Sequence, residues 1–148
     1  MRSLLATFLV LCILPTTQTL GHNYDATQFN TLNDSLNVFV AARNYADAIK
    51  FCNKNLNSSY HPTITRFLII NKARLFIKSK TNIDSVPILH RQEQSIVHEV
   101  DSLALYLSAR SLEVLGYYFY YSGDINQALQ TLNRADSAYS KTNSFTSR

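Results

Sequence analysis

Four residues in one stretch of the chain have the types and spacing that could bind a metal ion. His90 and Glu93 are three residues apart, as are His98 and Asp101, and this spacing puts each pair on one face of a helix. Helix geometry separates His90 from Asp101 by about 16 Å, so the two pairs cannot share one ion. Both histidines also lie opposite a leucine stripe, which predicts surface positions. Since no further Cys or His stands at ligand spacing, we expect no metal site and no cofactor.

Catalytic patterns are also missing from the sequence. It has no Ser-His-Asp order, no glycine-rich phosphate loop and no nucleophile elbow. Cys52 lies on an apolar stripe, which favours a small buried hydrophobe over a reactive thiol. The triplets at Asn33 and Asn57 fit glycosylation acceptors, but Asn33 is expected in mid-helix, which favours a chance match. We therefore expect no catalytic residues and a protein that is not an enzyme.

Basic residues are concentrated in a stretch without acidic residues, between Asp47 and Asp84. They are Lys50, Lys54, Arg66, Lys72, Arg74, Lys78 and Lys80. Such a stretch suggests nucleic acid as a partner, but a short charge run is more often a solvated face. The net charge of the whole sequence is only +4, so we expect no nucleic-acid binding.

The elements that position these residues are predicted to be helices. Between Ala109 and Tyr139, apolar and small residues recur at spacings of three and four, which predicts two amphipathic helices separated by Gly123 and Asp124. The recurring residues are Leu112, Leu115, Gly116, Phe119, Ile125, Ala128, Leu132, Ala135 and Tyr139.

This stretch resembles the tetratricopeptide repeat (TPR), whose unit is about 34 residues long. The residues that match the family pattern are Leu112, Leu115, Gly116, Phe119, Gly123, Ala128, Leu132 and Ala135. Leu112 replaces the usual leading Trp, and Ser140 replaces the usual closing Pro. The resemblance implies an all-α fold of antiparallel helix pairs stacked as a short right-handed α-solenoid.

Three units are expected, at about residues 29–62, 63–108 and 109–142. In the first unit the motif RNYADAIKFC aligns with GDINQALQTL, so Arg43 stands over Gly123. A positive φ would be strained at Arg43, which makes Asn44 the expected turn residue.

The middle unit is longer than a standard repeat. Thr63 to Ser79 is apolar nearly all round, which predicts a helix buried between neighbours. Pro87 suits the first turn of the next helix. That helix breaks at a point the sequence does not locate, since Asp101 and Ser108 are both plausible N-caps.

Residues 1–21 have the build of a secretory signal peptide. Arg2 precedes an apolar run from Leu4 to Leu14, which is too short for a membrane span of about 20 residues. We expect cleavage near Gly21 and export to the periplasm or cell envelope if the source is bacterial, and secretion otherwise. The remaining chain would hold Cys52 as its only cysteine and no membrane span.

One TPR-like domain is expected over 22–142, followed by a polar tail at 143–148. Asp25 is expected to cap the first helix. The tail shows no capping helix, although terminal repeats normally need one. The last helix is therefore expected either to dock on another molecule or to continue into a longer protein.

The resemblance further implies a concave groove lined by the first helix of each unit. The residues expected in it are Asn33, Asn37, Arg74, Lys78, Arg110, Glu113, Tyr117, Tyr120 and Tyr121. The aromatic run 117–121 points around the whole helix, so some tyrosines must lie near solvent or a partner. Amides, two bases and tyrosines suit a peptide with some acidic character. The alternative is a solvated basic face with tyrosines at the edge of the core.

Our first functional hypothesis is an exported module that binds a peptide or protein partner. Exported TPR regions of this kind often precede a membrane span and a signalling module, so the resemblance implies the N-terminal part of an envelope sensor or regulator. The second hypothesis is a structural protein that self-associates through its last helix and has no separate ligand. The third, a small enzyme, has no supporting set of residues.

Overall fold

The computed structural model describes residues 26–58, 61–96 and 101–146. Within these ranges the chain forms six α-helices and one 3-10 helix, and no strand, which confirms the expected all-α class. The expected signal peptide at 1–21, the Asp25 cap and His98 lie outside the described residues.

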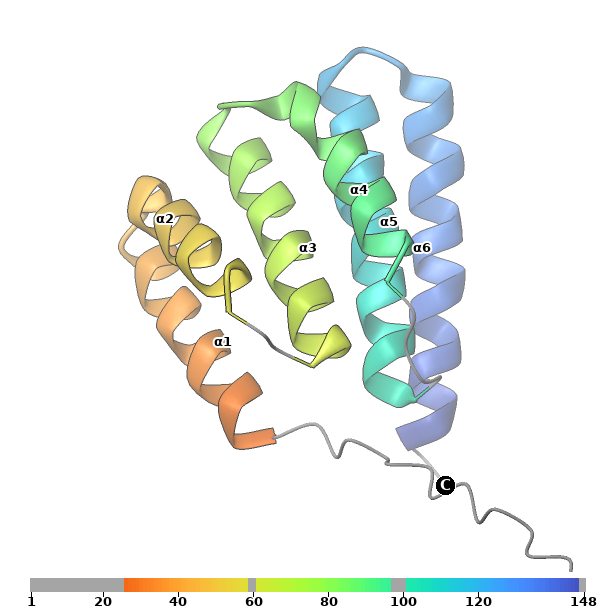
Figure 1. Cartoon of the computed structure of the whole chain (residues 1–148). Helices are drawn as coiled ribbons and strands as arrows, with labels where there is room; N and C mark the ends of the chain where they lie inside the picture. The colour runs from red at the N-terminus through yellow and green to blue at the C-terminus, as the bar shows by residue number, and fades with distance from the viewer. Residues whose placement is uncertain (1–25, 59–60, 97–100, 147–148) are drawn as a thin grey trace, which may run out of the picture.

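The helices lie side by side from one end of the molecule to the other, each running roughly opposite to its predecessor in the pairs α1–α2, α3–α4 and α5–α6 (Figure 1). Their bounds are α1 Ala26–Ala41, α2 Tyr45–Leu56, α3 Pro62–Ser79, η1 Ile83–Ser85, α4 Val86–Gln94, α5 Ser102–Tyr121 and α6 Ile125–Thr146. α3 packs against α2, α4 and α5, and α5 packs against α6. α3 is therefore the central helix of the fold.

Side chains cap the starts of several helices, α2 and α5 among them. Asn44 Oδ1 accepts a hydrogen bond from the backbone N–H of Asp47 (3.3 Å) at the start of α2. Asp101 Oδ1 accepts one from the N–H of Ala104 (2.6 Å) at the start of α5. Each bond satisfies an N–H that has no partner within its helix. Asp101 is thus the cap that follows the break, whereas Ser108 lies inside α5.

The turn between α1 and α2 differs from the prediction. Arg43 has a φ of 54°, whereas Asn44 has a φ of −85°, so the expectation that Asn44 would turn the chain is wrong. The capping bond fixes Asn44 outside the left-handed region and leaves Arg43 to make the turn. In the α5–α6 turn the same region is occupied by Gly123, with a φ of 83°, at no steric cost.

α3 is buried over most of its surface, as predicted for the stretch 63–79. Its buried residues are Thr63, Ile64, Arg66, Phe67, Leu68, Ile69, Ile70, Ala73, Leu75, Phe76 and Ile77. The ring of Phe67 lies 4.7 Å from that of Phe29 in α1. Cys52 on α2 is fully buried, which confirms its expected place in the core, and burial raises the pKa of its thiol to about 12.

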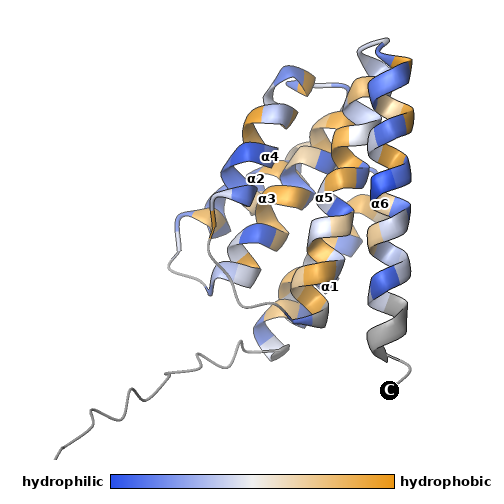
Figure 2. Ribbon diagram, turned by 90° about the vertical axis from the view of Figure 1, so that its right-hand side faces the viewer, coloured by the Kyte–Doolittle hydropathy of each residue, from blue (hydrophilic) through white to orange (hydrophobic). Residues whose placement is uncertain are grey.

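Small residues bring α5 and α6 close together. A Cβ atom added to Gly116 would lie 2.7 Å from the Leu132 side chain, and Ala128 and Ala135 are buried. Hydrophilic and hydrophobic residues alternate along α6 (Figure 2). α5 begins at Ser102, earlier than the unit boundary expected at 109, and α6 continues to Thr146, into the stretch expected to be a polar tail.

Among the described residues, no helix combines the length and apolar character needed to cross a membrane.

Candidate functional site

Helices α1, α3 and α5 line two adjoining hollows, which we call the groove. The first, of about 300 Å³, lies between α3 and α5 and is lined by Arg74, Ile77, Lys78, Arg110, Glu113, Val114, Tyr117 and Tyr121. The second, of about 380 Å³, is lined by Phe29, Asn33, Asn37, Phe67, Ile70, Asn71, Arg74, Leu103, Tyr106, Leu107 and Arg110. Arg74 and Arg110 belong to both, so the two hollows meet at these arginines.

The groove brings together most of the residues that the sequence analysis placed in it. Those that line it are Asn33, Asn37, Arg74, Lys78, Arg110, Glu113, Tyr117 and Tyr121. Tyr120 is exposed but lines neither hollow. Its ring instead contacts that of Tyr121, with centroids 5.4 Å apart.

Helical spacing would have found two further polar residues of the groove. Asn71 lies three residues before Arg74 on α3, and Tyr106 lies four residues before Arg110 on α5. Residues three or four apart share a helix face. Both could therefore have been added once Arg74 and Arg110 had been placed on that face.

Arg110 is held by neighbours within the groove wall. Its Nη1 lies 2.6 Å from Glu113 Oε2, and the hydroxyl of Tyr139 donates to the same oxygen at 2.7 Å. Burial acts to lower the pKa of Arg110, but the interactions with Glu113 and Tyr139 together outweigh it and the pKa is raised. Burial and the bond to Glu113 also raise the pKa of Tyr139. These contacts fix a charged pair in place at the α5 side of the groove.

Arg74 differs from Arg110 because its guanidinium makes no hydrogen bond within the described part of the chain. Its Nε is buried without a partner, and the side chain is half-buried between the two hollows. Burial lowers the pKa of Arg74, and the nearby charge of Arg110 lowers it further. An arginine stays protonated even so, which leaves a positive charge without a hydrogen-bonding anion.

A second polar cluster lies where α3, α4 and α5 meet. Arg66 Nε donates to Glu93 Oε1 at 2.6 Å, and its Nη2 forms an ion pair with the same carboxylate. The other Glu93 oxygen accepts from Ser111 Oγ at 2.9 Å and from the Gln94 side chain at 2.7 Å. Arg66 and Glu93 are 1% and 0% exposed, so this is a buried ion pair supported by further hydrogen bonds.

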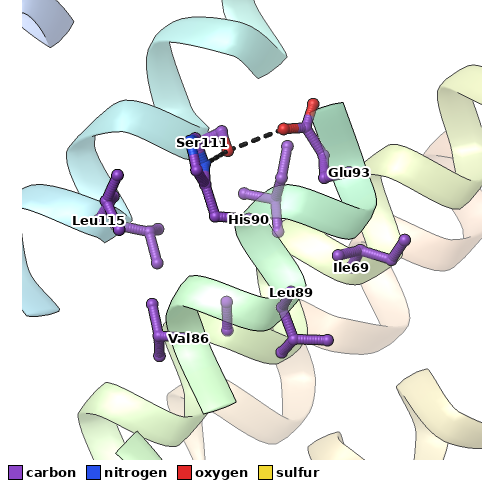
Figure 3. A pocket seen from close by; sticks show the side chains of 10 residues that line it. Ile69, Val86, Leu89, His90, Glu93, Ser111 and Leu115 are labelled. Carbon is purple, nitrogen blue, oxygen red and sulfur yellow. Dashed lines mark hydrogen bonds between the residues drawn. The ribbon is translucent and has the colours of Figure 1, made fainter. Parts of the chain in front are cut away.

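The prediction that His90 lies on the surface is wrong. His90 is half-buried, and its Nδ1 lies 2.7 Å from Ser111 Oγ, on the side of α4 that faces α5 (Figure 3). Ser111 donates its one hydroxyl proton to Glu93, so the His90 Nδ1–H must donate to Ser111. Burial lowers the pKa of His90.

The cluster of His90, Ser111 and Glu93 is not arranged for nucleophilic catalysis. A serine nucleophile must donate its proton to the histidine that acts as base, whereas Ser111 donates to Glu93. The hollow beside the three residues measures only about 10 Å³, roughly the space of one water molecule. A substrate therefore has no room to reach Ser111, and we assign this cluster a structural role.

Within the described ranges, no three His, Cys, Asp or Glu side chains lie close enough together to hold a metal ion.

Comparisons of the chain with protein-family models, with curated proteins and with solved structures found no match.

Proposed function

We propose that this chain is an exported TPR-like module that binds a peptide or a segment of a partner protein in the groove. The observation that carries the proposal is that α1, α3 and α5, the first helices of three successive helix pairs, line adjoining hollows. A stack of helix pairs forms a continuous binding face of this kind. Further support comes from Gly116 and Leu132, which pack closely at the positions that the family pattern assigns to a helix crossing.

The surface of the groove suits a peptide better than a small metabolite. It is an open trough that combines apolar side chains with the amides of Asn33, Asn37 and Asn71. Amides can pair with a peptide backbone. Tyr117 and Tyr121 are 45% and 55% exposed, and exposed tyrosines give large contact areas with few rotamers to lose on binding.

Selection of peptides from a displayed random library, with the purified chain as bait, tests the proposal. We expect enriched peptides whose affinity falls about tenfold or more for the double variant Tyr117→Ala with Tyr121→Ala, because tyrosines that a ligand covers are common hot spots. Tyr120→Ala is the matched control, since Tyr120 is equally exposed but lies outside the groove. Circular dichroism should show unchanged helicity in all variants.

Two results would contradict binding in the groove. One is a selection that enriches no peptide sequence. The other is an enriched peptide that binds the double variant as tightly as it binds the unsubstituted chain.

A second candidate function, self-association, is favoured by an exposed apolar pair on α6. Ile125 and Leu129 are 57% and 62% exposed and lie one turn apart on the helix. If this face joins two copies, light scattering should give a mass that rises with concentration. The variant Leu129→Glu should then remain monomeric. A monomeric mass at high concentration rejects this function.

Export and a role in an envelope sensor or regulator belong to the proposal as well. They rest on the signal-peptide pattern of residues 1–21, a basic residue followed by a short apolar run, and on the TPR resemblance. N-terminal sequencing of the protein recovered from its host tests the first part. A mature chain that starts near Gly21 is expected, and a chain that still begins at Met1 rejects export by cleavage.

A further inference from the structure

We propose that two copies of this chain join through one end of the row of helices, as a closed dimer in which the two α6 helices run antiparallel. The contact is made by Tyr120, Ile125 and Leu129, which we call the end patch. This inference rests on self-association, the second candidate function above, and adds to it the arrangement and the number of copies. Peptide binding in the groove is independent of it, because none of the three residues lines the groove.

The end patch lies on the last helix pair of the row. α6 packs on one side, against α5, and lies at the end of the row opposite α1 and α2 (Figure 1). Tyr120 lies just before the α5–α6 turn and Ile125 begins α6 after it. Leu129 follows Ile125 by one turn, on the same face of the helix. Each of the three side chains is more than half exposed, so the patch offers apolar surface to another molecule.

The size of the end patch suits a weak dimer. Covering a whole aromatic side chain buries about 150–250 Å², so three side chains of this exposure offer about 300 Å² of mostly apolar surface per copy. Since protein interfaces are somewhat more than half apolar, this is the apolar share of about 500 Å² per copy, or about 1,000 Å² in total. Such a total lies near the lower limit for a specific interface. We therefore expect a dimer in equilibrium with the monomer.

The surroundings of the end patch favour a second copy over a charged partner. Exposed neighbours on α6 include Asn126, Gln130 and Asn133, which carry no charge. An amide has both a donor and an acceptor, so it can pair with an amide on an identical surface. Interfaces commonly combine an uncharged apolar centre with a polar rim. A second copy of the chain supplies both parts.

The two ends of the row differ too much to join head to tail. At the end formed by α1 and α2, Val38 is the one exposed large hydrophobic side chain among the described residues. A head-to-tail contact would set the end patch against this mostly polar surface and could continue into a filament. A contact of the end patch with itself covers apolar surface on both copies and closes after two.

Asp136 determines the direction of the two helices. It is exposed and lies seven residues after Leu129, on the same face of α6. Parallel helices would bring the two Asp136 carboxylates together, and such like-charge contacts oppose association. Antiparallel helices centred between Ile125 and Leu129 place the carboxylates about 27 Å apart, well beyond the screening length of about 8 Å at physiological salt. Ile125 of each copy then faces Leu129 of the other.

Sedimentation equilibrium of the purified chain tests the closed dimer. We expect a mass that rises with concentration from one copy towards two and no further. Ile88→Glu is the matched control and should leave the dimer unchanged, because Ile88 is similarly exposed but lies on α4. A monomer at every concentration rejects self-association as a whole and the dimer with it. A mass that climbs past two copies rejects the closed dimer alone.

A pair of opposite charges tests the antiparallel contact. Ile125→Lys and Leu129→Glu should each weaken the dimer about tenfold or more, because each sets a charge against an apolar side chain. An equal mixture of the two variants should recover most of the dimer. One contact in the mixed dimer joins the opposite charges, and the other keeps Ile125 against Leu129. Circular dichroism should show unchanged helicity, since both positions are exposed. A mixture no more dimeric than either variant alone rejects the antiparallel arrangement.

The selected peptides separate the dimer from the groove. A peptide should bind Leu129→Glu as tightly as it binds the unsubstituted chain, because Leu129 lines neither hollow. Weaker binding to this variant would contradict the independence of the two surfaces. Failure to select any peptide rejects binding in the groove and leaves the dimer to be judged by the mass measurements.

Discussion

Arg66 and Arg74 stand two turns apart on the same helix, and each has one buried nitrogen without a partner, but Arg66 forms an ion pair with an acid and Arg74 does not. Arg66 is almost fully buried and bonded to Glu93 and Ser108. Arg74 is half-buried and makes no hydrogen bond within the described chain. A buried cation with its anion present contributes to folding, whereas one without an anion is available to a ligand. The comparison teaches that the groove side of α3 carries the functional charge.

The strongest test of this contrast removes the partner of Arg66. Glu93→Ala should lower the free energy of unfolding by about 3–5 kcal/mol, because it leaves a buried guanidinium without its counter-charge. Urea denaturation followed by circular dichroism measures the loss. The double variant Arg66→Met with Glu93→Leu should recover most of it, since apolar residues of similar volume often replace a buried ion pair without cost. A loss below about 1 kcal/mol in Glu93→Ala would contradict the structural role of the pair.

This contrast marks the limit of what the sequence can predict. Most of the groove follows from helical spacing together with the TPR resemblance, which implies that the first helix of each unit faces the same side. The burial of His90 does not, since the stripe that includes Leu89 indicated a single buried face on the other side of the helix. α4 packs against both α3 and α5, so the face that carries His90 is covered as well. Only the tertiary arrangement shows which of the two arginines of α3 forms an ion pair with a carboxylate.

Glu113 allows the comparison to be reversed. Glu113→Gln should free Arg110 and give the groove a second unpaired cation, so a selected peptide that carries an acidic residue should bind more tightly. Stability should fall by about 0.5–1.5 kcal/mol, because the bonds from Arg110 and Tyr139 lose their charged acceptor. Titration with such a peptide and urea denaturation measure the two effects. Weaker binding of the peptide to this variant would contradict the expectation.

His90 makes the stability of the protein depend on pH. Burial lowers its folded pKa below the ordinary histidine value of about 6.5, so the unfolded chain binds a proton more readily. The His90 contribution to stability is therefore present above about pH 6.5 and is lost as the pH falls from there through the folded pKa. Nearby Glu93 opposes this shift, and Arg134 adds to it. In His90→Gln, the fall in stability between about pH 7 and pH 5 should be smaller. If stability falls equally steeply with pH in both proteins, His90 is not the cause of the fall.

Arg74 should have the smallest effect on folding. Arg74→Gln is expected to change the free energy of unfolding by no more than about 0.5 kcal/mol, because no hydrogen bond is lost and repulsion with Arg110 is relieved. Urea denaturation at low and high salt tests this, since relief of repulsion should be larger at low salt. A loss above about 1 kcal/mol would mean that Arg74, like Arg66, supports the fold. A neutral result together with weaker binding of a selected peptide would mean that the two arginines of α3 serve different purposes.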